Sequence, residues 1–328
     1  MRETQQRTHA LAERYRRFAE NEARGSSPLY QHLALHVSGC GDILNFLMSL
    51  PADRRQPNLF LAAVRHAVHV PRDGPELERL VLSHGPAIAR VMRNRTTQTN
   101  EPARCAVMLP VLARLPQPLA LIEVGASAGL CLLPDRYGYD YGRTHLHPAD
   151  TGAIAPIFPC QANDATPLPS ALPNVVWRAG LDLNPLSVSA PDDMAWLETL
   201  VWPEQQERLV RLRAAIEIAR RDPPRVVRGN LLSDLRRLLP EVPPGVQRVI
   251  FHTAVLAYVD SQSDRDAFAD LVRDMDAVWI SNEMPGTFPR IAAKAPRHGG
   301  AAKFLLAVDG EPVAWTGPHG QSIDWFAD

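Results

Sequence analysis

Leu119-Ala-Leu-Ile-Glu-Val-Gly-Ala-Ser-Ala-Gly-Leu-Cys-Leu132 is the stretch that decides the fold. Residues 119–123 form a mostly apolar run that is typical of a fully buried strand. The small residues at 125–129 favour a tight turn, and the apolar spacing after them predicts a helix. A strand, a small-residue turn and a helix place backbone N–H groups at the carboxyl edge of a parallel sheet, where a ligand can bind.

This turn is compatible with three interpretations. In the first, Glu123, Gly125, Ser127 and Gly129 form the acidic, glycine-rich turn of a class I methyltransferase, whose carboxylate reaches the amino-acid part of S-adenosylmethionine. In the second, Gly125, Ser127 and Gly129 form a GxSxG nucleophile elbow with Ser127 as the nucleophile. In the third, the turn joins two elements and binds nothing. The remainder of the chain has to discriminate between them.

Composition limits the functional classes. The 328 residues, 45% of them hydrophobic, can form one large α/β domain with an appendage or two ordinary domains. A formal net charge of -1 gives no electrostatic case for nucleic acid or for a membrane surface. The four cysteines contain no CxxC pair, and neither a signal peptide nor a membrane-spanning run is evident, so we expect a cytoplasmic protein with reduced thiols.

Residues 1–115 predict a helical cap, because helix signals recur there without a convincing strand. An α/β-hydrolase places several strands and an oxyanion-hole loop before its elbow, so this region weakens the hydrolase interpretation. The polar stretch 97–101, followed by Arg104, leads into the last helix of the cap. It predicts either a solvated loop with an N-cap at Asn100 or a ligand-facing lid that includes Glu101.

Residues 116–328 predict an α/β domain with an irregular insertion at about residues 132–174. The alternating tyrosines at 137, 139 and 141 favour a short strand within it. His145, His147 and Asp150 are residue types that bind metals, but they lack a third well-placed ligand, and we expect no metal site.

After the insertion, strand and helix patterns alternate. Strands are predicted at residues 175–185, 225–231, 246–253 and 277–283, with a final hairpin at 302–308 and 312–315 around Asp309-Gly310. A long helix is predicted from residue 191 to about residue 221. This alternation predicts a doubly wound, mostly parallel sheet whose last hairpin adds an antiparallel strand. Asp182 lies at the end of the second strand of the unit, where an acid accepts the two ribose hydroxyls of a nucleotide; the alternative is an ordinary turn residue.

The chain resembles the class I methyltransferase fold and, more closely, a largely actinobacterial family known as domain of unknown function 2332. The segments that carry the resemblance are residues 97–101 with Arg104, 123–130, 135–137, 178–185, 202–203 and 251–258. They extend over essentially the whole chain. The first resemblance implies S-adenosylmethionine as cofactor, and the second implies a fold without a settled activity.

Four residues depart from the methyltransferase pattern. Ser127 stands where a second glycine is usual, and its side chain can crowd the cofactor or hydrogen-bond to it. Asn230 ends the third strand where an aspartate commonly contacts adenine, although an amide can both donate and accept. His252 and Thr253 end the fourth strand in place of a motif for amino methylation. These departures leave the use of the cofactor open.

Three functional hypotheses follow, each for a small-molecule substrate, with a non-catalytic binder as a further alternative. The first is methyl transfer, with Glu123 and Asp182 holding S-adenosylmethionine and His252 or Glu283 as the base. The second is a cofactor-independent intramolecular displacement, such as closure of a small nitrogen ring in natural-product biosynthesis. It needs an amine-binding pocket lined by Glu101, Glu123 and Glu283.

The third hypothesis is a serine hydrolase. Its residues are Ser127, an acid such as Asp260 or Asp309, and His319, in the chain order of an α/β-hydrolase. The sequence predicts neither a protein partner nor an oligomeric state.

Overall fold

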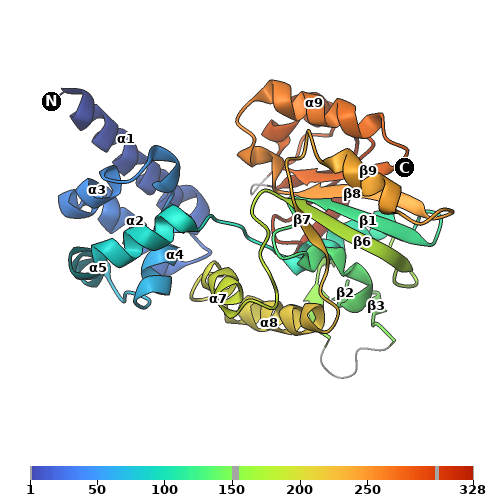
Figure 1. Cartoon of the computed structure of the whole chain (residues 1–328), viewed down its shortest axis with the longest axis horizontal. Coiled ribbons are helices and arrows are strands. Elements are labelled where there is room, and N and C mark those ends of the chain that lie inside the picture. The colour runs from blue at the N-terminus through green and yellow to red at the C-terminus, as the bar shows by residue number, and fades with distance from the viewer. Residues whose placement is uncertain (1, 150–154, 300–302, 328) are drawn as a thin grey trace. The chain divides into compact units, whose positions relative to one another are not determined.

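The computed structural model of the chain describes residues 2–149, 155–299 and 303–327 (Figure 1). It consists of two compact units. The helical unit contains Met1–Thr99 and Asp192–Val210, and the sheet unit contains Asn100–Pro191 and Arg211–Asp328.

The helical unit is built from α-helices and short helical turns. Their bounds are α1 Arg2–Phe18, η1 Ala19–Ala23, α2 Pro28–Gly39, α3 Gly41–Met48, η2 Ala52–Arg54, α4 Pro57–Ala67, α5 Gly74–Asn94 and α7 Pro191–Thr199, with the first part of α8 Gln206–Arg221. Side-chain caps define where helices begin: Ser27 accepts the N–H of Tyr30 at α2, and Asp73 accepts the N–H of Glu76 at α5. Proline in the first turn of both helices supports the same starts.

The segment Asp192–Val210 completes the core of the helical unit although it is far away in sequence. Trp196 is fully buried, and its indole N–H donates to the carbonyl of Thr96 at 2.9 Å. Trp202 packs its ring against Phe18 and Tyr30, with ring centroids 5.9 Å and 5.7 Å away. The single helix expected over residues 191–221 is therefore interrupted around Trp202, and the interruption contributes to this core.

The sheet unit contains a nine-stranded mixed sheet in the order β5-β12-β11-β10-β9-β8-β1-β6-β7. The strand bounds are β1 Leu119–Val124, β5 Gln161–Ala162, β6 Val175–Asp182, β7 Val226–Arg228, β8 Gln247–Thr253, β9 Val278–Glu283, β10 Phe304–Val308, β11 Glu311–Thr316 and β12 Ser322–Trp325. The helical elements are η3 Pro102–Arg104, α6 Cys105–Leu112, η4 Leu130–Leu132, η5 Pro134–Arg136, the remainder of α8, η7 Leu235–Glu241, η8 Leu256–Tyr258, α9 Gln262–Arg273, η9 Pro285–Thr287 and α10 Pro289–Ala292.

The five neighbouring strands β7, β6, β1, β8 and β9 are parallel to one another. They confirm the predicted α/β class. From β9 onward, β10, β11 and β12 continue as an antiparallel meander. The predicted hairpin is present at Asp309 and Gly310, whose φ angles of 52° and 82° are those of a two-residue turn with both φ values positive. The mixed sheet follows from this meander.

The strand register assigns the side chains of the sheet to two faces. One face presents Ile122, Ile250 and Trp279, which form the main apolar core with Phe268 and Val272 of α9. The opposite face presents Glu123, Thr253 and Asn282, because paired residues of parallel strands share a face and neighbouring residues alternate. α6 contacts β10 of the same sheet.

The α-helix predicted after the 125–129 turn is absent from the described chain, and this prediction was wrong. Only the short turns η4 and η5 follow β1. Residues 130–133 are all buried, so they lack the polar stripe of a surface helix, and Pro134 then interrupts the chain. The chain continues into a small sheet of β2 Gly138–Asp140, β3 His145–Leu146 and β4 Ile157–Pro159, which confirms the expected tyrosine-rich strand. Asp150 lies outside the described residues.

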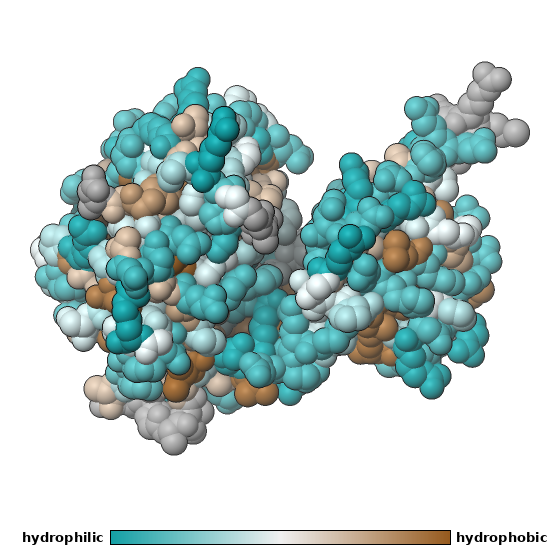
Figure 2. All heavy atoms as spheres, turned by 180° about the vertical axis from the view of Figure 1, so that it is seen from behind, coloured by the Kyte–Doolittle hydropathy of each residue, from teal (hydrophilic) through white to brown (hydrophobic). Residues whose placement is uncertain are grey.

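Apolar residues are scattered among hydrophilic ones on the surface that Figure 2 displays. Among the helices that the structure describes, none is both long and apolar enough to cross a membrane.

Candidate functional site

Buried polar side chains gather at the carboxyl ends of the parallel strands. In open α/β sheets, ligands bind beyond these ends at the point where the strand order reverses. Here that point lies between β1 and β8. Glu123 is the next-to-last residue of β1, and Thr253 is the last residue of β8. Arg104 reaches the same place from η3, since its Nη1 donates to the carbonyl of Thr253 at 3.1 Å.

Glu123 is the most distinctive group at this edge. It is 2% exposed, and Oε2 has no hydrogen-bond partner within the described part of the chain. Burial raises the pKa of Glu123 well above its ordinary value; Cys131 and Asp182 raise it further, whereas the positive charge of Arg104 lowers it. A buried carboxyl with an unused oxygen and a raised pKa is a candidate base or ammonium acceptor.

Arg104 joins three segments that are distant in sequence. Its Nε donates to the carbonyl of Pro318 at 2.9 Å, in the turn between β11 and β12, while its Nη1 contacts the end of β8. The guanidinium carbon lies 5.7 Å from the ring centroid of Phe304. At 7% exposure, Arg104 supplies the positive charge that buried carboxyl groups require.

Asn100 and Glu101 have different roles from those that the sequence suggested. The N-cap predicted at Asn100 was wrong: Glu101 is the residue that caps η3, where its Oε1 accepts the N–H of Ala103 at 3.2 Å. Asn100 instead accepts the N–H of Leu130 at 2.8 Å, and the thiol of Cys131 donates to the carbonyl of Glu101 at 3.3 Å. These bonds fasten the η3 segment to the chain after the glycine turn. Nothing in the sequence signals this role of Cys131 beyond its place in an apolar run.

The glycines of the turn make room for side chains of this same chain. A Cβ at Gly125, where φ is +74°, would lie 2.2 Å from Cγ2 of Val255. A Cβ at Gly129 would lie 2.8 Å from Cγ of Pro224. Ser127 has a positive φ of 52° and is 3% exposed. The space beside the turn is therefore filled by apolar side chains, and sequence reasoning did not identify Val255.

Asp182 holds the turn in place. Its Oδ2 accepts the N–H of Ser127 at 2.8 Å, and its Oδ1 accepts the N–H of Asn184 at 2.7 Å. Asn230 is exposed after β7; its side-chain oxygen accepts the N–H of Leu232, and its own N–H donates to Asp234. Asp182 and Asn230, which were predicted to contact the cofactor, thus hydrogen-bond to local backbone groups instead.

His252 and Glu283 form a buried pair on the face of the sheet opposite to Glu123. Trp279 Nε1 donates to His252 Nε2 at 3.0 Å, so Nδ1 carries the proton and donates to Glu283 Oε1 at 2.8 Å. The same oxygen accepts the N–H groups of Val255 and Leu256. Both ring nitrogens of His252 are engaged, and this geometry argues against His252 as the general base. It also separates Glu283 from the expected carboxylate pocket.

The candidate hydrolase residues do not converge around Ser127. Asp309 accepts the N–H of Trp279 at the amino end of β9, which is the edge of the parallel strands opposite to Ser127. Asp260 is exposed after η8, and His319 is exposed in the turn after β11. The described residues before β1 contain helices and no strand. These positions argue against the hydrolase interpretation.

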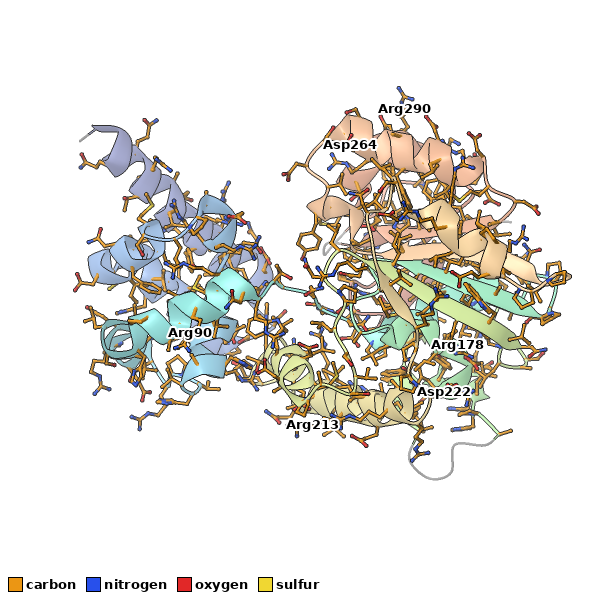
Figure 3. The ribbon with its side chains drawn as sticks, viewed as in Figure 1. Arg90, Arg178, Arg213, Asp222, Asp264 and Arg290 are labelled. Atoms are coloured by element: carbon orange, nitrogen blue, oxygen red, sulfur yellow. The ribbon has the colours of Figure 1, made fainter. Side chains whose placement is uncertain are left out.

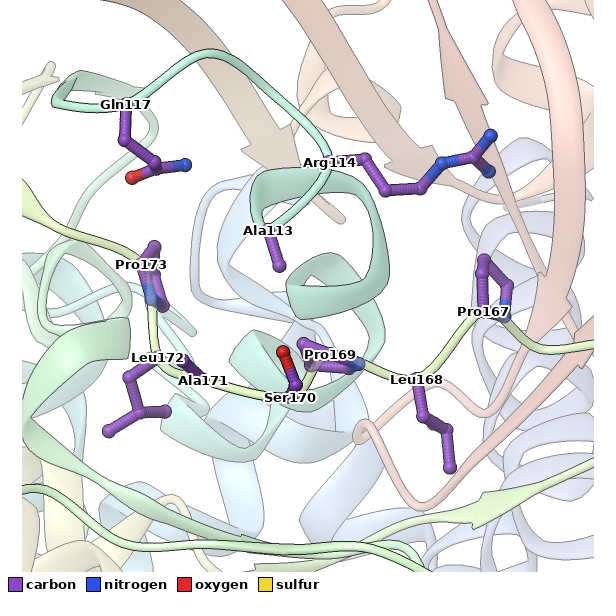
Figure 4. Close-up of a pocket in the computed structure, with 10 residues that line it drawn as sticks. All are labelled: Ala113, Arg114, Gln117, Pro167, Leu168, Pro169, Ser170, Ala171, Leu172 and Pro173. Atoms are coloured by element: carbon purple, nitrogen blue, oxygen red, sulfur yellow. The ribbon is translucent and has the colours of Figure 1, made fainter.

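Two cavities lie elsewhere in the sheet unit. Figure 4 shows a pocket of about 580 Å³ that is lined by Ala113, Arg114, Gln117 and residues 167–173, which precede β1 and β6 and so lie at their amino ends. A cavity of about 830 Å³ begins at residues 284–287, directly after Glu283, and includes Arg265, Arg297 and Lys303. The cationic side chains of the second cavity favour an anionic ligand.

A family model described as an uncharacterised protein conserved in bacteria (DUF2332) matches residues 12–325. The chain belongs to this family. No curated protein and no solved structure matches this DUF2332 chain. Membership therefore establishes a relationship that covers nearly the whole chain, without an activity.

The carboxyl edge of this DUF2332 protein does not fit S-adenosylmethionine. Val255 fills the space beside Gly125, and both carboxylate oxygens of Asp182 hold the turn itself. Within the described chain, no α-helix begins after the turn to offer its N-terminus to a ligand. The Oε2 atom of Glu123, which has no hydrogen-bond partner among the described residues, matches what the amino group of this cofactor needs.

Proposed function

We propose that this protein is an enzyme that binds a small amine-bearing molecule at the carboxyl edge of β1 and deprotonates it with Glu123. The observation that carries the proposal is the buried Glu123 carboxyl, whose Oε2 lacks a partner among the described residues. Buried polar groups are nearly always hydrogen-bonded, so an unused carboxylate oxygen at the ligand-binding edge of a sheet favours a ligand donor.

The proposed reaction is an intramolecular displacement that needs no cofactor. Glu123 accepts a proton from the substrate ammonium group, and the nitrogen lone pair attacks a neighbouring carbon of the same molecule. A C–N bond forms, the bond from that carbon to an anionic leaving group breaks, and the electron pair departs with the anion. A base works best when its pKa lies near the operating pH, and burial raises the pKa of Glu123 in that direction.

Arg104 has a supporting role in this proposal. Its positive charge lies close enough to Glu123 to lower the pKa of that carboxyl. The same charge stabilises the anionic leaving group as it departs. The residues Asn100, Asp182 and Val255 hold the surrounding segments, which keeps the reacting groups oriented. Such positioning accounts for much of the rate of an intramolecular reaction.

The test uses vicinal amino sulfate esters, starting with 2-aminoethyl sulfate, as probes. Ligand-observed NMR should detect binding to the wild type, and ion chromatography should detect released sulfate. A charge-assisted hydrogen bond contributes about 1.5–3 kcal/mol, so Glu123→Gln should weaken binding by roughly 10- to 100-fold and abolish release. The exposed Glu241→Gln is the matched control. Equal binding by Glu123→Gln and wild type contradicts the proposal.

Methyl transfer with S-adenosylmethionine is the second candidate, and the acidic residue at the end of β1 favours it. Calorimetry with S-adenosylhomocysteine separates the two. We expect no binding heat, because Val255 fills the space beside Gly125. Micromolar binding that is lost in both Glu123→Ala and Asp182→Ala would establish the cofactor site instead.

A further inference from the structure

Three side chains of the helical unit bring metal-ligating atoms together. Among the described residues, His36, Cys40 and Glu78 form a group in which one ligand atom of each lies within 4.8 Å of the others. His36 and Cys40 are one helical turn apart at the end of α2, so they share one side of that helix. Glu78 approaches from α5.

His36 is fixed by a close backbone approach. A Cβ at Gly74 would lie 2.2 Å from Cγ of the imidazole, so glycine is needed where the ring packs. Nε2 of His36 is buried and lies 3.5 Å from Oε2 of Glu78, and no described residue makes a hydrogen bond to it. A buried nitrogen that is oriented and lacks a hydrogen bond is suited to a ligand in that position.

Cys40 lies at the junction of α2 and α3, where it occupies the N-cap position of α3. The residue is 8% exposed, and burial raises the pKa of its thiol, although the nearby backbone N–H groups of Ile43 and Asp42 offset part of that rise. N–H donors at a helix N-terminus stabilise a thiolate, which is the form of cysteine that binds metals.

We propose that His36, Cys40 and Glu78 bind a zinc ion in the helical unit. An imidazole nitrogen, a thiolate and a carboxylate are three of the donors that Zn²⁺ prefers, and three protein ligands leave a fourth position for water. The charges of thiolate and carboxylate balance those of the ion. The ligand side chains of His36 and Glu78 are 27% and 33% exposed, which gives a soluble ion access.

This site goes beyond the proposed amine chemistry, because it lies in the other unit and shares no residue with Glu123. Its spacing matches no short zinc motif, since α3, η2 and α4 lie between Cys40 and the helix that contains Glu78. The expectation from the sequence that no metal is bound rested on the absence of a CxxC pair and of a third ligand beside His145 and His147.

The experiment titrates Co²⁺ and then Zn²⁺ into the full-length chain, prepared without an affinity tag and stripped with a chelator. We expect tetrahedral d–d bands together with a sulfur-to-cobalt charge-transfer band, both displaced by Zn²⁺. Cys40→Ser should abolish the charge-transfer band, and His36→Gln and Glu78→Gln should weaken Zn²⁺ binding. The exposed His32→Gln, one turn earlier on α2, is the matched control and should behave as wild type.

Gly74→Ala tests the geometry without removing a ligand. The added methyl group displaces the imidazole of His36, so Zn²⁺ affinity should fall by roughly 10- to 100-fold, as it does when residues supporting a ligand are changed. Circular dichroism verifies that each variant is folded. Absence of the bands in folded wild type, or a charge-transfer band that persists in Cys40→Ser, overturns the proposal.

Discussion

The buried carboxyl group of Glu123 carries a free-energy cost that a bound ligand can relieve. Desolvation disfavours its charged form, and the nearby Arg104 offsets only part of this cost. An unpaired oxygen in such a place destabilises the fold unless a ligand or water contacts it. The expected consequence is a measurable link between pH and stability.

We predict that Glu123→Gln changes this pH dependence. Burial raises the pKa of the folded carboxyl above its unfolded value of about 4.3, so the folded chain retains a proton that the unfolded chain has lost. Stability therefore decreases as pH rises above that value, by at most about 1.4 kcal/mol per pH unit, until the folded carboxyl ionises. Glu123→Gln should lack this decrease.

Urea unfolding between pH 4 and pH 8 provides the measurement, with the exposed Glu13→Gln as a control that should keep the wild-type slope. Parallel profiles for wild type and Glu123→Gln would show that the carboxyl does not titrate as its burial requires.

A second prediction concerns Gly125. Gly125→Ala places a methyl group against Val255 and forces alanine to a φ of +74°. Together these effects should destabilise the chain by about 2–4 kcal/mol. In a double-mutant cycle, Val255→Ala should relieve at least about 1 kcal/mol of that loss, because it removes the collision but not the backbone strain. Additive effects in urea unfolding would mean that Val255 does not occupy this space.

At the scale of elements, the chain after β1 is held by an ion pair where a helix was expected. Arg178 on β6 (Figure 3) donates to both oxygens of Asp135 at 2.8 Å and 2.9 Å, and to the carbonyl of Leu132. The two side chains are 13% and 15% exposed. This bidentate contact ties η4 and η5 to the sheet.

Arg178→Met should therefore destabilise the fold strongly. Removal of one partner of a buried pair costs about 3–5 kcal/mol, because the remaining charge loses its partner. Arg16→Met, which removes an exposed pair within α1, should cost less than about 1 kcal/mol. Thermal unfolding compares the two variants, and similar losses would contradict the structural role of the Arg178 contact.

The same elements show what sequence reasoning can and cannot reach. Buried parallel strands such as β1 and β8 are apolar runs, so they were predicted to within a residue or so of their ends. β12 and β5 were not predicted, because such short strands exist through their pairing with neighbours. The location of Glu123 at a strand end was predicted. The face on which Glu283 lies depends on the parity of the register, which an apolar run does not reveal.

At the scale of the whole molecule, the helical unit is not continuous in sequence. Trp196 is fully buried and Trp202 is half-buried, and both come from the segment that follows β6 in the sequence. Arg95 also pairs with Asp193 of that segment at 2.6 Å. A contact between segments a hundred residues apart leaves no periodic signal, which explains why the sequence assigned residues 191–221 to the sheet domain.

This discontinuity predicts that residues 1–99 alone cannot form a stable helical unit. Without the segment, the apolar contacts around Trp196 and Trp202 are missing, and their burial contributes several kcal/mol in total. A peptide of residues 191–210 should bind fragment 1–99 and increase its helicity. Fragment 1–99 contains no tryptophan, so the fluorescence of the two peptide tryptophans reports binding directly.

We expect a blue shift that saturates with fragment concentration. A peptide with Leu197→Asp, which places a charge at a position 1% exposed, should give no shift. A fragment 1–99 that unfolds cooperatively by itself and leaves the peptide spectrum unchanged would show that the helical core is complete without this segment.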